Sequence, residues 1–297
     1  QSAMKVALTG ATGFVGSHVL TELIEHGHQV TALVRDAARA DAVAARGAIP
    51  VVVDLYDRPT LVRLLSEADG AVHTASPGDA TSAGLDSAVV DAVIEAFAGT
   101  GKPYVQISGL WVYGANGSIS ESSPFNAPPM VAWKEAIERR ALDAKDIRAV
   151  VIVSSVAYGD GGGALPGLLL YSPRDDAGNL IMVGSGQQRW STIHVADLAE
   201  VFRRVLEDDT ARGYYVVSDG RQPTVAELTE AAAVAAGGAG AVPGSEAEAR
   251  ARVGDYFAEV LLLDQAANTA TRTRTELGWT PSRPSLVEEF RSGSYHK

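Results

Sequence analysis

Apolar residues along the first half of the chain alternate between two periods, one typical of strands and one typical of helices. Short apolar runs rich in β-branched residues predict strands, and apolar positions three and four residues apart predict helices. Strands alternating with helices pair in parallel, so the sequence predicts an α/β protein with a doubly wound parallel sheet. The predicted strands are residues 5–9, 29–34, 50–53, 71–74, 104–108 and 147–153, and the clearest helices are 15–26, 85–99 and 128–145.

The alternation becomes less regular in the second half. Residues 160–167 are glycine-rich and predict a loop, and a return to the sheet is expected near residues 190–217. A chain of 297 residues exceeds the usual size of one domain. We therefore expect a sheet domain over residues 1–158 and a smaller α+β lobe made mainly of residues 159–297.

Composition narrows the classes of partner. The net charge of −11, without a basic run, argues against nucleic acid, and no apolar run approaches the roughly 20 residues of a membrane span. Without a cysteine there is no thiolate nucleophile or thiolate metal ligand, and His26, His28 and His73 lack the spacing of a metal site. We expect a cytoplasmic protein with a small-molecule partner and no metal.

A glycine-rich motif, TGATGFVG at residues 9–16, lies between the first predicted strand and the first predicted helix. In this position Gly10 permits a tight turn, Gly13 lets the backbone approach a pyrophosphate, and Gly16 allows close packing of helix and sheet. A glycine-rich turn without a ligand is the alternative. The motif predicts a dinucleotide held by the backbone of Gly10, Thr12, Gly13, Phe14, Val15 and Gly16.

The end of the second predicted strand bears on the choice of dinucleotide. Val34 is followed by Arg35 and Asp36, with Arg39 one turn on. A guanidinium group can bind the 2′-phosphate of NADP, so the sequence favours NADP over NAD, unless both arginines are simply solvated at a helix start. Asp54, after the third strand, either accepts from the adenine amino group or caps the helix beginning near Arg58.

Several motifs in the same order resemble the short-chain dehydrogenase/reductase superfamily, in its extended branch of NAD(P)-dependent epimerases and dehydratases. The resemblance covers nearly the whole chain and implies a Rossmann-like sheet, a small C-terminal substrate lobe and possible homodimers through residues 86–99 and 130–145. It also implies that Leu55, Thr74, Ala75, Ser76, Lys134 and Ser154 lie around the cofactor. The motifs are residues 9–16, Asp54-Leu55, His73-Thr74-Ala75-Ser76, Val112-Tyr113-Gly114, Ala157-Tyr158-Gly159, residues 194–199 and residues 277–281.

The resemblance implies a catalytic Ser, Tyr and Lys with a supporting Asn, and here only the lysine is present, as Lys134. Met130 occupies the tyrosine position, Gly109 the serine position and Asp86 the asparagine position. A thioether cannot transfer a proton, and no tyrosine lies between Phe125 and Lys145, so a shifted alignment does not restore one. The site is therefore atypical.

The candidate replacements are Ser108, Tyr113, Tyr158, Ser154, Ser155 and Asp86. Tyr113 and Tyr158 are alternatively structural tyrosines, and Ser108 is alternatively a plain strand end. We take Lys134, Ser108 and Tyr113 as the catalytic candidates and Met130, Gly109 and Tyr158 as the candidates for the substrate pocket. His194 and Asp197 resemble a catalytic pair, but the family pattern implies a strand-to-helix junction with a capping aspartate instead.

Two functions remain open from the sequence. The first is an NADP-dependent oxidoreductase of small carbonyl or alcohol substrates, in which Lys134 orients the ribose and Ser108 or a water supplies the proton. The second is a sensor that binds NADP without chemistry, because the usual tyrosine and serine are absent.

Overall fold

A parallel sheet forms the centre of the computed structural model, which describes residues 3–267 and 270–296. Within those residues the sheet has seven strands in the order β10-β6-β5-β4-β1-β2-β3, and every neighbouring pair is parallel. The predicted doubly wound parallel sheet is confirmed. The strands are β1 (Lys5–Thr9), β2 (Gln29–Val34), β3 (Ile49–Val52), β4 (Gly70–His73), β5 (Pro103–Gly109), β6 (Arg148–Ser154) and β10 (Gly213–Val217).

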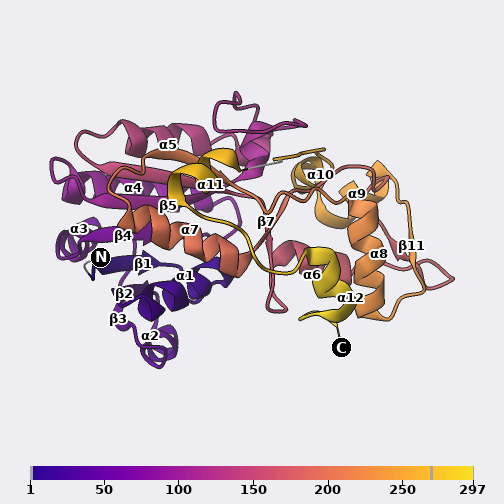
Figure 1. Ribbon diagram of the computed structural model, residues 1–297, viewed down its shortest axis with the longest axis horizontal. Coiled ribbons are helices and arrows are strands. Elements are labelled where there is room, and N and C mark those ends of the chain that lie inside the picture. Colours follow the sequence, from indigo (N-terminus) through magenta and orange to yellow (C-terminus); the bar gives the residue numbers. More distant parts are fainter. Residues whose placement is uncertain (1–2, 268–269, 297) are drawn as a thin grey trace.

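Helices cover both faces of this sheet (Figure 1). Because side chains alternate along a strand, Val6 and Leu8 of β1 pack toward one helical layer and Ala7 toward the other. The first layer contains α1 (Phe14–Glu25), α2 (Ala37–Ala44) and α7 (Val195–Glu207), and α11 (Thr271–Leu277) packs beside α7 and β10. The second layer contains α3 (Arg58–Ser66), α4 (Ser82–Phe97) and α5 (Lys134–Asp143).

A smaller lobe lies beside the sheet and has its own apolar core (Figure 1). Leu169, Leu228, Leu261 and Phe290 are almost fully buried within it. Its helices are α6 (Ala164–Leu170), α8 (Val225–Ala236), α9 (Glu246–Val253), α10 (Asp255–Leu261) and α12 (Leu286–Ser292). Two small sheets accompany them, β11 (Ala241–Val242) with β8 (Leu180–Ile181) and β7 (Val156–Tyr158) with β9 (Thr192–His194).

Three details differ from the sequence prediction. The predicted helix over residues 128–145 is interrupted: Pro129–Val131 is a separate 3₁₀ helix, and α5 begins only at Lys134. The predicted loop over residues 160–167 ends earlier, because α6 begins at Ala164. In the expected return near residues 190–217, β9 pairs with β7 instead, whereas β10 does join the central sheet. The boundary at residue 158 stays a prediction.

Two local features accompany the break before α5. The Met130 carbonyl accepts a hydrogen bond from the side chain of Trp133, at Nε1 and 3.0 Å. Pro129 fits only the first turn of a helix, where its missing N–H has no consequence.

None of the helices among the described residues is long and apolar enough to serve as a membrane span.

Candidate dinucleotide site

The turn between β1 and α1 requires glycine at two positions. Gly10 has a φ of 73°, and a Cβ there would lie 2.5 Å from Thr74 Oγ1 and 2.6 Å from the Ala75 nitrogen. A Cβ on Gly16 would lie 1.8 Å from the Gly10 carbonyl oxygen. The start of α1 therefore packs directly against the backbone that follows β1 and β4, and neither Gly10 nor Gly16 leaves room for a side chain.

The N-terminus of α1 is open in a way that suits an anion. Its N-cap is Gly13, which has no side chain, and the first turn holds no acidic residue. The first N–H groups of an α-helix have no partner within the helix and carry the positive end of its dipole. In the part of the chain that the structure describes, α4, α5, α6, α10 and α11 also lack a side-chain cap, whereas six helices have one, provided by Asp36, Asp57, His194, Thr224, Ser245 and Ser285.

A buried polar chain fixes the strand ends beside this turn. Thr9 Oγ1 lies 2.6 Å from His73 Nδ1, and His73 Nε2 lies 2.8 Å from Asp86 Oδ1. Thr9 Oγ1 also accepts from the Thr74 and Ala75 nitrogens, at 3.1 and 3.2 Å. Asp86, a candidate replacement for the missing catalytic groups, is therefore held by His73. Sequence reasoning missed this role of His73, because its partners are 64 and 13 residues away.

The predicted residues that follow β4 begin next to the glycine turn. Thr74 Oγ1 donates to the Thr9 carbonyl at 2.7 Å, so it meets the glycine turn directly. Ser76 lies two residues further on, with Oγ 3.4 Å from Ser82 Oγ at the start of α4. Thr74, Ala75 and Ser76 thus follow the strand adjacent to β1, at the carboxyl edge of the sheet where ligands of doubly wound folds bind.

At the end of β2, Arg39 is paired with Asp36, whereas Arg35 is not. Asp36 caps α2 by accepting from the Arg39 nitrogen at 2.9 Å, and it also forms an ion pair with the Arg39 side chain. Arg35 is exposed. The hydrogen bonds from Arg39 hold the pKa of Asp36 below its usual range, so this carboxylate stays charged next to Arg39. Of the two predicted phosphate ligands, Arg35 is the one not engaged by Asp36.

Asp54 lies after β3 and is exposed, with Leu55 partly buried beside it. Its Oδ1 accepts from the Tyr56 nitrogen at 2.9 Å. The alternative that Asp54 caps the helix near Arg58 is wrong, since Asp57 is the N-cap of α3 and accepts from the Thr60 nitrogen.

At the end of β5, Gly109 borders open space and Ser108 is buried. A Cβ built on Gly109 would meet no atom within 4 Å, so this position borders open space. Ser108 points the other way, since neighbouring side chains of a strand face opposite sides, and its exposed fraction is 4%. Among the described residues its Oγ has no hydrogen-bond partner within normal geometry, although it lies close enough to Glu138 to lower the pKa of that carboxyl.

Lys134 and Glu138 lie one turn apart on α5. Lys134 is half-buried, with Nζ 4.6 Å from the centre of the Trp133 ring. Glu138 is fully buried, and its Oε1 accepts from the Tyr214 hydroxyl at 3.2 Å. Met130 precedes them in the 3₁₀ helix, and its side chain packs against an apolar cluster. The prediction that residues 130, 134 and 138 share one helix face is wrong for Met130 and holds for the other two.

Replacing Glu138 by glutamine should change how stability depends on pH. Burial raises the pKa of Glu138 above its ordinary value of 4.5, against the opposing effects of Ser108, Lys134 and Tyr214. The folded protein thus binds this proton more tightly than the unfolded chain does. The contribution to stability is complete below about pH 4.5 and is lost as the pH rises through the folded pKa.

We therefore expect Glu138→Gln to become more stable relative to wild type as the pH rises from about 4 to 8. Urea unfolding at each pH measures this difference. Glu25→Gln, at an exposed position, is the control for the loss of one negative charge. A constant difference between Glu138→Gln and wild type over this range would contradict the prediction.

The remaining hydroxyl candidates are buried in the interior, and among the described residues the hydroxyl of Tyr113 has no hydrogen-bond partner. Tyr113 is 1% exposed, its ring packs on Phe125 at 5.1 Å between centroids, and burial raises the pKa of its hydroxyl. Tyr158 is fully buried, and its hydroxyl donates to the Pro284 carbonyl at 2.7 Å. These surroundings favour the structural alternative for both tyrosines. Ser154 Oγ donates to the Ser155 carbonyl at 2.7 Å, and Ser155 Oγ to the Val217 carbonyl at 2.8 Å.

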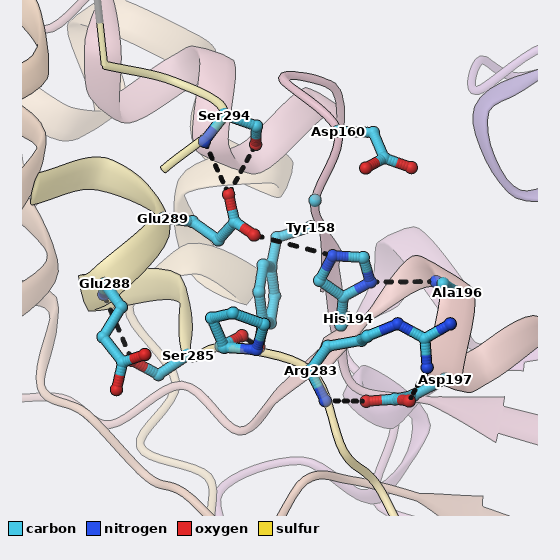
Figure 2. Close-up of polar contacts among 12 residues, drawn as sticks. Tyr158, Asp160, His194, Ala196, Asp197, Arg283, Ser285, Glu288, Glu289 and Ser294 are labelled. Atoms are coloured by element: carbon cyan, nitrogen blue, oxygen red, sulfur yellow. Dashed lines mark hydrogen bonds and ion pairs between the residues drawn. The ribbon is translucent and has the colours of Figure 1, made fainter. Parts of the chain in front are cut away.

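His194 and Asp197 face different partners (Figure 2). Asp197 accepts from the backbone and the guanidinium of Arg283, both at 3.1 Å. His194 Nδ1 accepts from the Ala196 nitrogen at 3.0 Å and so caps α7, while its Nε2 lies 3.7 Å from Glu289 Oε1. The junction of strand and helix is as expected, but the capping residue is His194, not Asp197.

Among the described residues no three His, Asp or Glu side chains gather as a metal site requires.

Comparison with known proteins identifies the family. The model of the "NAD dependent epimerase/dehydratase family" matches residues 6–218. The chain belongs to this family. A relative from Schizosaccharomyces pombe, "Uncharacterized protein C2A9.02", is 28% identical over 98% of this chain and 100% of its own length.

Two solved structures share the fold of this family member. Human epimerase family protein SDR39U1 with NADPH has a TM-score of 0.75 and 23% identity, over 98% of this chain and 99% of that one. UDP-glucose 4-epimerase of Thermus thermophilus in complex with NAD has a TM-score of 0.74 and 22% identity, over 97% of this chain and 99% of that one. At these identities the likeness concerns the fold.

Proposed function

We propose that this chain is an NADP-dependent oxidoreductase of an atypical, extended short-chain dehydrogenase type, acting on a small carbonyl or alcohol substrate. The observation that carries the proposal is the pairing of Gly10 and Gly16 beneath the uncapped N-terminus of α1, a cradle that any Cβ would fill. Membership of the epimerase/dehydratase family supports a nicotinamide dinucleotide there.

The proposed contacts follow from the positions of the residues. The backbone of Gly13, Phe14 and Val15 would hold the pyrophosphate, and Thr74, Ala75 and Ser76 would line the adjacent strand end. Exposed Arg35 would bind the 2′-phosphate of NADP, which supports NADP over NAD. Leu55 and Asp54 would lie beside the adenine, and Ser154 beside the nicotinamide end, as the family pattern implies.

When bound, the nicotinamide supplies hydride transfer. The residues of this chain would position the substrate and control protons around it. The ammonium group of Lys134 would bind the ribose hydroxyls, and the open space at Gly109 would admit the substrate next to Met130. Because Ser108 Oγ is buried against α5, a water in the open space beside Gly109 is the better proton donor of the two that the sequence left open.

Titration calorimetry with NADPH and NADH tests the cofactor, and a panel of aldehydes and ketones tests the chemistry. We expect NADPH to bind more tightly than NADH, and NADPH oxidation with at least one carbonyl. No binding of either nucleotide would overturn the proposal. Tight NADPH binding without turnover across the panel would favour the second function, a sensor that has lost the chemistry.

The sensor is supported by Met130 and Gly109, which replace the tyrosine and serine of the family pattern. The double variant Met130→Tyr, Gly109→Ser separates the two functions, and the open space at Gly109 admits the new side chain. Reductase activity gained by this variant from a silent parent would favour the sensor. An active parent would exclude it.

A further inference from the structure

The loop at residues 159–163, between β7 and α6, lies against the first turns of α1. A Cβ on Gly162 would come within 2.6 Å of the Phe14 ring, so the loop backbone packs directly on that ring. In the same loop, Asp160 Oδ2 lies 2.6 Å from His18 Nε2 of α1. Phe14 directly follows Gly13, and the loop therefore touches the first residue of α1, immediately after the proposed phosphate-binding turn.

The C-terminal segment holds this loop by hydrogen bonds at three points. The Tyr295 hydroxyl accepts from the Gly159 nitrogen at 2.7 Å and donates to the Gly162 carbonyl at 2.5 Å. Ser294 Oγ accepts from the Gly161 nitrogen at 2.9 Å. Tyr295 is 6% exposed and its bond from the Gly159 nitrogen is buried, whereas the bond from Gly161 to Ser294 lies at the surface. Residues 130 or more positions apart in the chain thus fix the loop at both its ends.

Glu289 of α12 anchors the C-terminal segment in turn (Figure 2). Its Oε2 accepts from the nitrogen and the hydroxyl of Ser294, at 2.7 and 2.6 Å. Its Oε1 faces His194 at the start of α7. The position of Ser294 and Tyr295 is therefore set by both α12 and a helix that packs on α1.

The loop needs support from outside. Asp160, which is not glycine, has a φ of 50°, and three of its four neighbours in the loop also have positive φ. Few residues adopt this backbone region without strain, and a glycine-rich segment loses much conformational entropy when it is ordered. Hydrogen bonds from Ser294 and Tyr295 offset part of that cost.

We propose that Ser294 and Tyr295 are positioning residues for the dinucleotide site, holding residues 159–163 against Phe14 so that docking of the C-terminal segment and dinucleotide binding favour each other. This rests on the proposed function, in which the turn before α1 binds the dinucleotide. By thermodynamic reciprocity, weakening the contact of Tyr295 weakens dinucleotide binding, and the bound dinucleotide strengthens that contact.

Tyr295→Phe tests this, because it removes only the hydroxyl. We expect about a tenfold rise in the Kd for NADPH by calorimetry, because the variant loses two hydrogen bonds to the loop and part of their free energy is transmitted to the dinucleotide site. Without nucleotide, the Gly159 amide of the variant should exchange its hydrogen faster than in wild type. In wild type, NADPH should slow that exchange.

Tyr215→Phe is the matched control. Tyr215 lies on β10, away from the loop. It is also buried, and its hydroxyl donates to Glu276 Oε1 at 3.3 Å. The Kd of Tyr215→Phe for NADPH should stay within about twofold of the wild-type Kd, even if the unfolding midpoint of the variant changes. A merely structural role of Tyr295 would lower the unfolding midpoint and leave the Kd unchanged.

The outcomes separate this inference from the proposed function. If wild type binds NADPH and Tyr295→Phe binds it equally well, the coupling is overturned while the proposed function stands. Unchanged exchange at Gly159 in Tyr295→Phe would overturn the positioning role itself. If wild type binds neither NADPH nor NADH, the proposed function fails and the coupling with it.

Discussion

Gly16→Ala should abolish dinucleotide binding and destabilise the protein by about 3 kcal/mol or more. The added methyl would lie 1.8 Å from the Gly10 carbonyl oxygen and 2.7 Å from Thr74 Oγ1. Neither can move freely, since the first is backbone and Thr74 Oγ1 donates to the Thr9 carbonyl. The helix must move outward, which takes its N–H groups away from the position of the phosphates.

Urea unfolding and NADPH calorimetry measure the two effects of Gly16→Ala. Gly167→Ala is the matched control, because Gly167 lies in α6 and a Cβ there would meet no atom within 4 Å. Alanine is favoured over glycine inside a helix, so Gly167→Ala should be neutral or more stable by up to about 1 kcal/mol. Wild-type affinity in Gly16→Ala would show that the phosphates do not bind at this turn.

Asp197→Ala should cost about 2–4 kcal/mol of stability, although Asp197 lies outside the proposed site. Its side chain is 1% exposed and accepts from the backbone nitrogens of Ser282 and Arg283, both at 3.1 Å. Removing the carboxylate leaves two backbone donors and the Arg283 guanidinium without this acceptor. The segment before α12 would therefore lose part of its attachment to α7, and it would keep the bonds of Trp279 to the Asp197 carbonyl and of Arg283 to Glu200.

The unfolding free energy of Asp197→Ala is best compared with that of Asp91→Ala. Asp91 pairs with Arg140 on the surface, where both side chains are about 40% exposed, and such exposed pairs contribute less than about 1 kcal/mol. Equal losses in the two variants would mean that Asp197 contributes no more than a surface charge. Because this segment is one of the connections between the smaller lobe and α7, we also expect Asp197→Ala to unfold the lobe at lower urea concentration than the sheet.

The sequence alone predicted those features of the fold that depend on residues close together in the chain. Hydrophobic period alone placed every central strand to within a residue or two, because a strand or helix shows its buried face in its own alternation. The spacing of the glycines in the turn was also a sufficient signal, although only the structure shows that Gly10 and Gly16 also pack against Thr74, which follows β4. The break before α5 was missed, because the amphipathic period continues through residues 128–145 and does not show where a helix is interrupted.

The sequence by itself determined the sheet, the glycine turn and the likeness to the epimerase/dehydratase family. The loss of the family's tyrosine and serine at Met130 and Gly109 stays a prediction. Only the tertiary structure decided which polar groups meet. It joined His73 to Asp86, turned Ser108 inward toward Glu138, and brought Tyr295 onto a loop more than 130 residues earlier. The physical reason is that periodicity records which side of an element is buried, whereas the partner of a buried polar group is chosen by packing between elements far apart in the chain.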